Sequence, residues 1–268
     1  MRDFRRYVVR LTAIAAISIA SLSCTLSEAS HKSPERLARA IWDEVNYDLN
    51  YINIILKKVI LFDNMLTLED EAEREAYLES ILNAASYKLD DNTYTILYIN
   101  EYNNYHTQVI KTSGGRISEG DTWEVSYSGA LGYTATITPT ERGYKVEFSR
   151  LYDDQCNTTA TLDMKYKLTT YTQNINALVS IEYTGSLALL DYTSSISRPL
   201  TIDTTIEKPM KYDGSVGMVG GRFDIVCRDR LYGTTDKVQA TITESPQMVT
   251  LSCMGSQWTV EVRNRTNL

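Results

Sequence analysis

The sequence predicts an α+β protein that is mainly β, with an N-terminal helical hairpin followed by an extended antiparallel β meander. Three observations predict it. Apolar residues recur every three or four positions between residues 34 and 85, and they alternate with polar residues from residue 86 onward. Turn-forming Gly, Asp and Ser pairs separate the alternating segments, with no helical pattern between them. Parallel strands would need long crossovers, so we expect antiparallel pairing in a curled sheet, a sandwich or a barrel.

The first helix is predicted to start at Pro34, because Ser33 can serve as its N-cap and proline is favoured in the first turn. It should end near Asp63. A second helix is predicted from Thr67, with Asp70 three residues later as a variant of the capping box. The short link between them favours an antiparallel helical hairpin. The apolar face of the first helix consists of Leu37, Ile41, Val45, Leu49, Ile52, Leu56 and Val59.

Strands are predicted where apolar side chains occupy every second position. Ten or more such segments in about 180 residues would curl or split into two sheets. An outer-membrane barrel would need strands of about 9–11 residues, and many of the segments here are shorter. The inward sets include Trp123, Val125 and Tyr127; Tyr144, Val146 and Phe148; Ala160, Leu162 and Met164; Val179, Ile181 and Tyr183; Phe223, Ile225 and Cys227; and Trp258, Val260 and Val262.

The N-terminus reads as a secretory signal peptide. Four arginines in the first ten residues precede an apolar run from Leu11 to Leu22, and small residues follow it. The run has about 12 residues, whereas a transmembrane helix needs about 20. A permanent membrane-spanning helix is therefore not expected.

The stretch Ala20-Ser21-Leu22-Ser23-Cys24 resembles the lipobox of bacterial lipoproteins, in the loose form found in Bacteroidota. In those proteins the cysteine becomes the acylated first residue of the mature chain. The resemblance implies lipidation at Cys24 and membrane attachment through its acyl chains, which together would hold the protein stably. It also implies export to the cell envelope as an outer-membrane lipoprotein that faces the periplasm or the surface.

These readings divide the chain into four parts. Residues 1–23 form the signal peptide and residues 24–33 a short lipidated tether. Residues 34–85 form the helical hairpin, packed on the antiparallel β region of residues 86–268. No Pro-, Gly- or Ser-rich linker separates the hairpin from the strands, so we expect residues 34–268 to form one compact unit.

Charge excludes one class of partner. The formal charge is −7, and loss of residues 1–23 would bring it to −10. Nucleic-acid binding proteins usually carry a basic face, so no nucleic-acid partner is expected. An acidic body would also stand away from an anionic bilayer surface.

Catalytic and metal-binding motifs are absent from the sequence. The chain has two histidines, and no H-x-x-x-H, C-x-x-C, G-x-S-x-G or phosphate-binding loop sequence occurs. We therefore expect no metal and no cofactor, and a non-enzymatic role is favoured. Cys156, Cys227 and Cys253 are interpreted as buried thiols. A Cys156–His106 catalytic pair has nothing local to support it.

Tyrosine is the unusual residue of this chain. Thirteen of the 19 tyrosines lie between Tyr87 and Tyr192. The densest stretch predicts a ligand-binding surface, because tyrosine with asparagine is typical of adaptable binding surfaces and a sugar can stack on an aromatic ring. The alternative is that these tyrosines are ordinary strand residues with packed rings. The candidate ligand-binding residues are Tyr94, Tyr98, Tyr102, Tyr105 and His106.

Three functions remain open from the sequence. The first is a lipid-anchored envelope protein that binds a protein or glycan partner or has a structural role. The second is a glycan-active hydrolase, which would need two carboxylates about 5–10 Å apart in a cleft. The third is a periplasmic carrier, which would need a continuous apolar cavity under the helices.

Overall fold

The computed structural model describes residues 33–81, 86–99, 105–128, 132–150, 156–170, 177–193, 199–213, 216–231, 233–243 and 248–261. Thirteen strands form one antiparallel sheet in chain order, and β1 and β13 are its two edges. The predicted mainly β fold with an antiparallel meander is thus confirmed, and the sheet is an open, curled one. The predicted signal peptide, Cys24 and Tyr102 lie outside the described residues.

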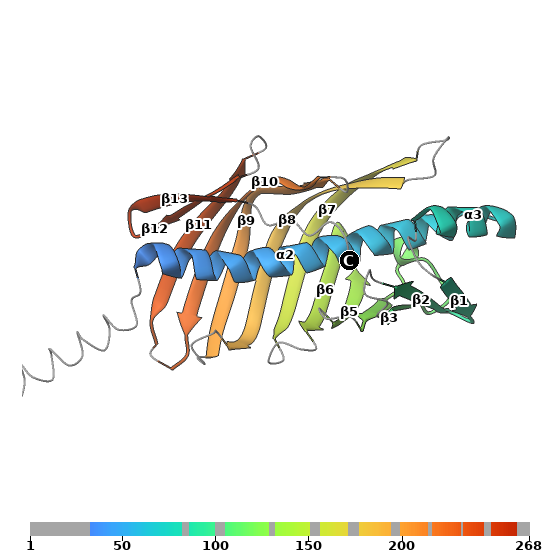
Figure 1. Cartoon of the computed structure of the whole chain (residues 1–268), viewed down its shortest axis with the longest axis horizontal. Helices are drawn as coiled ribbons and strands as arrows, with labels where there is room; N and C mark the ends of the chain where they lie inside the picture. The colour runs from blue at the N-terminus through green and yellow to red at the C-terminus, as the bar shows by residue number, and fades with distance from the viewer. Residues whose placement is uncertain are drawn as a thin grey trace, which may run out of the picture.

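Figure 1 shows the sheet curled around one long helix, α2, which runs along its concave side. None of the described helices is long and apolar enough to cross a membrane. The elements in chain order are α2 (Pro34–Met65), α3 (Glu71–Ile81), β1 (Ser86–Asp90), β2 (Thr93–Ile99), β3 (Tyr105–Lys111), the short 3₁₀ helix η1 (Ile117–Glu119), β4 (Trp123–Tyr127), β5 (Tyr133–Pro139), β6 (Gly143–Arg150), β7 (Asn157–Thr170), β8 (Ala177–Thr193), β9 (Pro199–Asp213), β10 (Gly217–Asp229), β11 (Thr235–Thr243), β12 (Met248–Cys253) and β13 (Ser256–Glu261).

Helix α2 is the centre of the core. Twenty of its 32 residues are buried, so it packs on several sides rather than along one narrow face. Near its start, the ring of Trp42 lies 5.7 Å from that of Phe223 in β10. Near its end, the ring of Phe62 lies 5.3 Å from that of Tyr94 in β2. These contacts place the N-terminus of α2 near the last strands and its C-terminus near the first.

Helix α3 starts later than the sequence predicts. Asp70 is its cap, because the side-chain Oδ1 accepts a hydrogen bond of 3.0 Å from the backbone N–H of Glu73. Thr67, the predicted cap, instead donates from its hydroxyl to the carbonyl of Asn64 at 2.7 Å. Figure 1 shows α3 beyond the C-terminal end of α2, so α2 is the helix that fills the concave side of the sheet.

Two glycines let the long central strands bend. Gly185 in β8 has φ of 135°, and Gly221 in β10 has φ of 144°. The pairing register shifts beside both, which is the mark of a β-bulge. A Cβ at Gly185 would lie 2.0 Å from the carbonyl oxygen of Thr161 on β7, so only glycine fits there. Figure 1 shows the upper parts of these strands turned sharply from the lower parts.

Candidate functional site

The concave face of the sheet is apolar along most of its cross-strand rows, but one row is polar. In register across β3 to β6, Gln108 faces Tyr127, Tyr127 faces Tyr133, and Tyr133 faces Arg150. Gln108, Tyr133 and Arg150 are buried and Tyr127 is half-buried. The Gln108 side-chain amide donates to the Tyr133 hydroxyl at 3.2 Å.

A polar stripe of α2 faces this row. Glu44, Tyr47, Asp48 and Tyr51 are spaced three or four apart, so they share one side of the helix. Asp48 is fully buried and Tyr51 nearly so, whereas Glu44 and Tyr47 remain half-buried. We call these four residues together with Gln108, Tyr127, Tyr133 and Arg150 the polar cluster.

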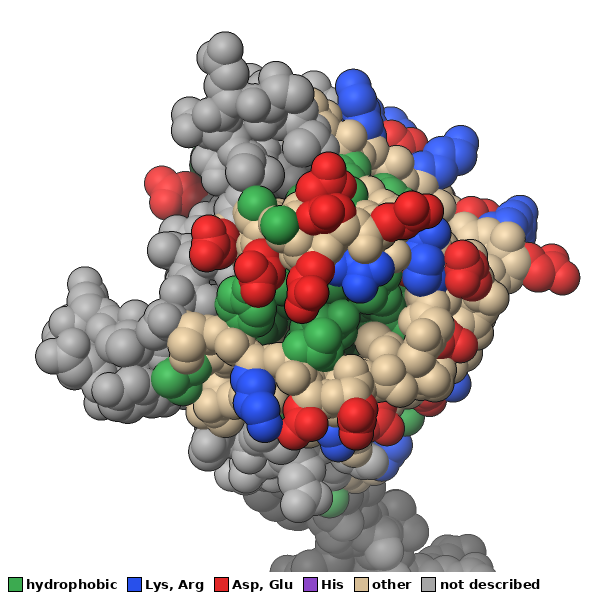
Figure 2. Space-filling view, turned by 90° about the vertical axis from the view of Figure 1, so that its right-hand side faces the viewer, with side chains coloured by type: hydrophobic (Ala, Val, Ile, Leu, Met, Phe, Trp, Pro, Cys, Tyr) green, Lys and Arg blue, Asp and Glu red, His purple; other side chains and the backbone are tan. Residues whose placement is uncertain are grey.

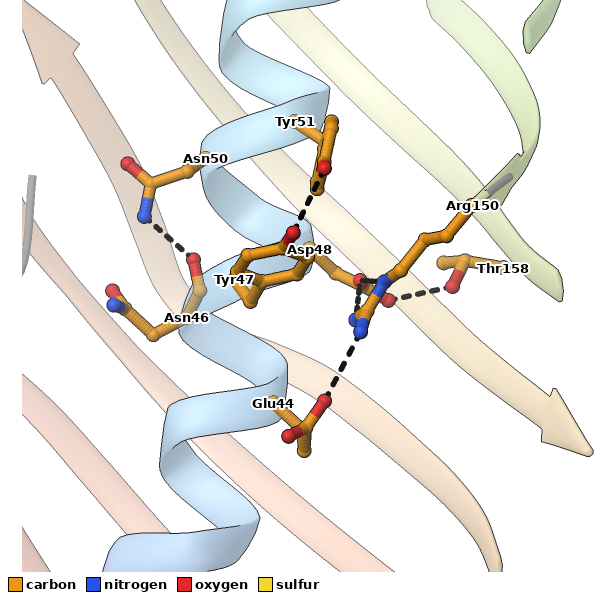
Figure 3. A network of polar contacts seen from close by, with 8 residues as sticks. All are labelled: Glu44, Asn46, Tyr47, Asp48, Asn50, Tyr51, Arg150 and Thr158. Carbon is orange, nitrogen blue, oxygen red and sulfur yellow. Dashed lines mark hydrogen bonds and ion pairs between the residues drawn. The ribbon is translucent and has the colours of Figure 1, made fainter. Parts of the chain in front are cut away.

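An ion pair joins the helix to the sheet within the polar cluster (Figure 3). The Nε of Arg150 donates to Asp48 Oδ1 at 3.0 Å, and its Nη2 contacts the same oxygen. Thr158 of β7 donates its hydroxyl to the second oxygen, Oδ2, at 2.5 Å. Glu44 Oε2 lies 3.2 Å from Arg150 Nη1. Asp48 therefore accepts hydrogen bonds at both oxygens, which is the pattern of an ionised carboxylate.

Burial and charge act against each other in this pair. Burial raises the pKa of Asp48, and the charge of Arg150 and the hydroxyl of Thr158 oppose the rise. Burial alone would lower the pKa of Arg150, but the neighbouring Asp48 carboxylate outweighs it and raises that pKa. The Arg150 guanidinium also lies 4.3 Å above the ring of Tyr47, a cation–π contact.

Aromatic rings connect this buried pair to the surface. Tyr51 lies 4.9 Å from Tyr47 and 5.3 Å from Tyr133 by ring centroid, and the Tyr47 and Tyr51 hydroxyls are 2.9 Å apart. Tyr133 stacks on Tyr127 at 5.9 Å, and Tyr127 lies 6.0 Å from His106. Tyr127 and His106 are half-buried, so the path ends in two rings that solvent reaches.

The structure brings part of the predicted binding residues to this place. His106 lies on β3 at the open end of the polar cluster, and the register places Tyr98 of β2 opposite it. Tyr105 pairs with Ile99 at the end of the same two strands. Tyr94 lies elsewhere: it is buried and packs on Phe62, as an ordinary strand residue would.

The sequence pattern did not predict the charged residues of the polar cluster. Arg150 continues the inward alternation of Tyr144, Val146 and Phe148, and Asp48 lies beside Leu49 on the apolar side of its helix. A charged residue at a core position usually has a buried partner of opposite charge. The position of Asp48 and Arg150 within the apolar repeat of their helix and strand was therefore the one sign in the sequence that both are buried and paired. The partners are 102 residues apart, and nothing in the sequence pairs them.

The cysteines of the described chain are free thiols, in agreement with the sequence interpretation. Cys156, Cys227 and Cys253 are all buried. Burial, followed by the charge of Asp48, raises the pKa of Cys156 to about 12, so its thiol stays protonated at neutral pH. No group of three or more metal-ligating side chains occurs in the part of the chain that the structure describes.

A second feature lies on the outer face of the sheet. A hollow of about 650 Å³ crosses β3 to β7, lined mainly by hydroxyl, amide and charged side chains. Glu124, Thr136 and Glu147 follow one another in register, so the two glutamates are two strand spacings apart, roughly 9.5 Å. Both glutamates are exposed, and Lys145 Nζ lies 2.7 Å from Glu147 Oε1.

Compared with protein-family models, with curated proteins and with solved structures, the chain matches none.

Proposed function

We propose that this chain is a lipid-anchored cell-envelope protein that binds a glycan through the open end of its polar cluster. The proposal rests mainly on one observation. His106 and Tyr127 present half-buried rings at the end of a polar row, on a concave face that is otherwise mostly apolar. Such a combination of ring faces and fixed polar groups is typical of a ligand site.

The chemistry of this end suits a sugar. A pyranose ring can stack on an aromatic face while its hydroxyls bond to amides and carboxylates. His106 and Tyr127 supply the faces, and Glu44 is half-buried near Arg150. The buried Asp48–Arg150 pair and the stacked tyrosines hold these groups in place, which lowers the entropic cost of binding.

The start of α2, which follows the proposed anchor in the chain, lies toward the opposite end of the described structure from the candidate site. Helix α2 begins at Pro34 beside β12 and β13, only ten residues after Cys24. The candidate residues lie on β2 to β4, toward the other end (Figure 1). Lipidation at Cys24 would therefore hold β12 and β13 near the membrane and turn the binding end away from it.

The binding proposal is tested by titrating the protein with oligosaccharides from peptidoglycan and from α- and β-glucans. We expect one class to bind and Tyr127→Ala to weaken that binding about tenfold or more, the value of a lost stacking contact of about 1.5 kcal/mol. The matched control is Tyr166→Ala, because Tyr166 is an exposed tyrosine on β7, away from the site. Equal binding by the two variants would contradict the proposal.

The anchor is tested separately in living cells. Cys24→Ala should leave the precursor without acyl chains and release the protein from the membrane fraction. Metabolic labelling with palmitate measures this directly. Label that persists in the variant would exclude Cys24 as the lipidation site, without bearing on glycan binding.

A second function has a specific observation in its favour. Glu124 and Glu147 line the outer hollow at about the carboxylate separation of inverting glycosidases, roughly 6.5–9.5 Å. In that reaction one carboxylic acid would protonate the leaving oxygen while the other carboxylate activates water. Release of reducing sugar from the same oligosaccharides, abolished in both Glu124→Gln and Glu147→Gln, would favour this function over binding alone.

The carrier function receives less support. Its requirement is an apolar cavity of several hundred Å³ under the helix. Helix α2 packs into one continuous core with the concave face, and the hollow of 650 Å³ lies on the opposite, outer face.

A further inference from the structure

Among the residues that the structure describes, strand β13 is an edge strand that contains no lysine, proline or bulge. Edge strands of soluble proteins commonly carry lysine, proline or a bulge, which discourage pairing with another chain. β13 reads Ser-Gln-Trp-Thr-Val-Glu, with none of these and with three residues that favour strands. The other edge, β1, contains Lys88 and Asp90, which form an exposed ion pair at 3.0 Å.

The turn before β13 determines which backbone groups face the free edge. Met254 and Gly255 have φ of 49° and 79°, which is the type I′ geometry of a two-residue hairpin. Cys253 and Ser256 close this turn and exchange hydrogen bonds, so Trp258 and Val260 also bond to β12. The N–H and C=O groups of Gln257, Thr259 and Glu261 therefore point to the open side.

We propose that β13 pairs with β13 of a second copy of this chain, antiparallel, about a two-fold axis at Thr259. In this register Thr259 faces Thr259 of the second copy, and Gln257 faces its Glu261. All three backbone positions that face away from β12 then bond across the interface. Trp258 and Val260, which are only partly buried at the edge of the core, would face Val260 and Trp258 of the second copy and extend the apolar inner face.

A second copy fits this edge better than another partner for two reasons. The edge is self-complementary, because in this one register threonine faces threonine, glutamine faces glutamate and tryptophan faces valine. The residues that precede α2 in the chain also join the described structure at this end, because α2 starts beside β12 and β13. If Cys24 is lipidated as proposed above, both anchors of the pair would enter the same membrane, and this confinement would raise the effective concentration of the edges.

The pairing is tested by cysteine cross-linking of the full-length protein in membranes, under mild oxidation. Across the two-fold axis the Thr259 Cα atoms would be about 5.5 Å apart, within disulfide reach. We expect Thr259→Cys to give a disulfide-linked dimer on a non-reducing gel. Gln257→Cys is the matched control, because its two copies would be four residues out of register, about 14 Å apart. The double variant Gln257→Cys/Glu261→Cys should cross-link again.

A reversed pattern would overturn the proposal. Equal cross-linking by Thr259→Cys and Gln257→Cys would indicate random collision, and none by either Thr259→Cys or the double variant would exclude the pairing. An independent measurement is the mass of the detergent-solubilised protein by light scattering. Thr259→Pro should convert the dimer to a monomer by removing an N–H that β12 does not use, whereas Thr259→Val should remain a dimer. A wild-type monomer also contradicts the proposal, whether or not glycan binds or Cys24 is acylated.

Discussion

Asp48 and Arg150 are far apart in the sequence, yet their charges meet in the core between α2 and β6. Such a pair adds little net stability, because two charges lose their water when it forms. Its effect is on geometry. The fork of Arg150 reaches two carboxylates of α2 and stacks on Tyr47, so it fixes the rotation of the helix against the sheet. We therefore expect that removing one partner lowers the free energy of unfolding more than replacing both partners with apolar residues.

The first prediction concerns this pair. Asp48→Asn removes the buried carboxylate that pairs with Arg150 and leaves its charge beside the half-buried Glu44, so it should lower the free energy of unfolding by about 3 kcal/mol. The double variant Asp48→Leu/Arg150→Met should recover most of the loss. Urea unfolding measures both. Arg39→Ala, which breaks the exposed ion pair with Glu35 on the same helix, is the control and should change stability by about 0.5 kcal/mol or less. An equal loss in Asp48→Asn and Arg39→Ala would show that the pair does not hold the helix.

The second prediction concerns Lys58 on α2. Burial, together with the charge of Lys57, lowers the pKa of Lys58 from 10.5 to about 7. Below about pH 7 the side chain is charged in the folded and the unfolded protein, and the folded state carries the full cost of burying it. Between about pH 7 and 10.5 only the unfolded state holds the proton, so this cost falls as pH rises. Stability relative to Lys58→Met should therefore increase across this window, by at most about 5 kcal/mol for the full shift and by less because solvent reaches the half-buried side chain.

Denaturant unfolding of both proteins at several pH values checks this prediction. The quantity to compare is the difference in the free energy of unfolding between the two proteins. Buried cysteines and tyrosines with raised pKa values lower the stability of both proteins above about pH 8.5, and this effect cancels in the difference. A difference that stays constant with pH would show that Lys58 keeps its ordinary pKa in the fold.

The third prediction concerns the thiols. Burial, with the charges of Asp236 and Asp229, raises the pKa of Cys227 to about 12, and burial also raises the pKa values of Cys156 and Cys253. Iodoacetamide reacts with the thiolate, so the folded protein should leave all three unlabelled at about pH 8, whereas urea should expose them. Mass spectrometry of the peptides distinguishes each site. Labelling of folded Cys156 would show that the polar cluster opens to solvent.

At the scale of elements, the spacing of apolar residues in the sequence predicted many of the helices and strands and which of their side chains face the core. The three-and-four spacing from Leu37 to Val59 predicted α2, and alternation predicted that Trp123 and Val125 face the core, where both are buried. The pattern could not predict that α2 is buried on several sides, because that depends on how far the sheet curls. The curl in turn depends on single glycines such as Gly185, whose close neighbour Thr161 is known only from the fold.

The fourth prediction tests this bend. Gly185→Ala would force a Cβ against the Thr161 carbonyl at a φ of 135°, and we expect it to cost about 2–3 kcal/mol and to loosen the packing of α2. Gly220→Ala is the matched control. A Cβ there meets only the Lys211 side chain at 3.6 Å, an ordinary contact, so the loss should stay near 1 kcal/mol or less. Thermal unfolding and hydrogen exchange of α2 amides measure both effects.

At the scale of the whole molecule, the strands follow one another across the sheet in the order of the sequence. Because each strand pairs with the next, position in the sequence becomes position along the sheet, from β1 at one end to β13 at the other. Helix α2 runs back along the whole sheet, so its start lies by the last strands and its end by the first (Figure 1). The sequence predicted the meander, but that α2 spans it lengthwise follows from contacts such as Trp42–Phe223 and Phe62–Tyr94.

The end away from β13 has its own surface character. Figure 2 shows apolar side chains in a hollow there, with acidic side chains and some basic ones around it. Helix α3 contributes Glu71, Glu73 and Glu75 to this end, all of them exposed. An anchored protein that turned this end to the membrane would bring these carboxylates toward anionic lipid headgroups, which is unfavourable. If Cys24 is lipidated, the charge of this end and the position of the anchor therefore favour the same orientation.

The last prediction measures that orientation. If Cys24 is lipidated as proposed, residues 24–33 would span at most about 35 Å, and the 32 residues of α2 would extend about 48 Å beyond them. A fluorophore at Arg36→Cys, on the exposed start of α2, should transfer energy strongly to an acceptor lipid in reconstituted vesicles. The same fluorophore at Glu75→Cys on α3 should transfer it weakly, because transfer falls steeply with distance. Adding salt distinguishes an orientation set by the tether from one set by charge repulsion. If the length of the tether sets the orientation, the difference in energy transfer between the two positions should persist when salt screens the charges. Equal transfer from both positions would mean that the protein lies flat on the membrane, with its candidate glycan site no farther from the bilayer than its anchor.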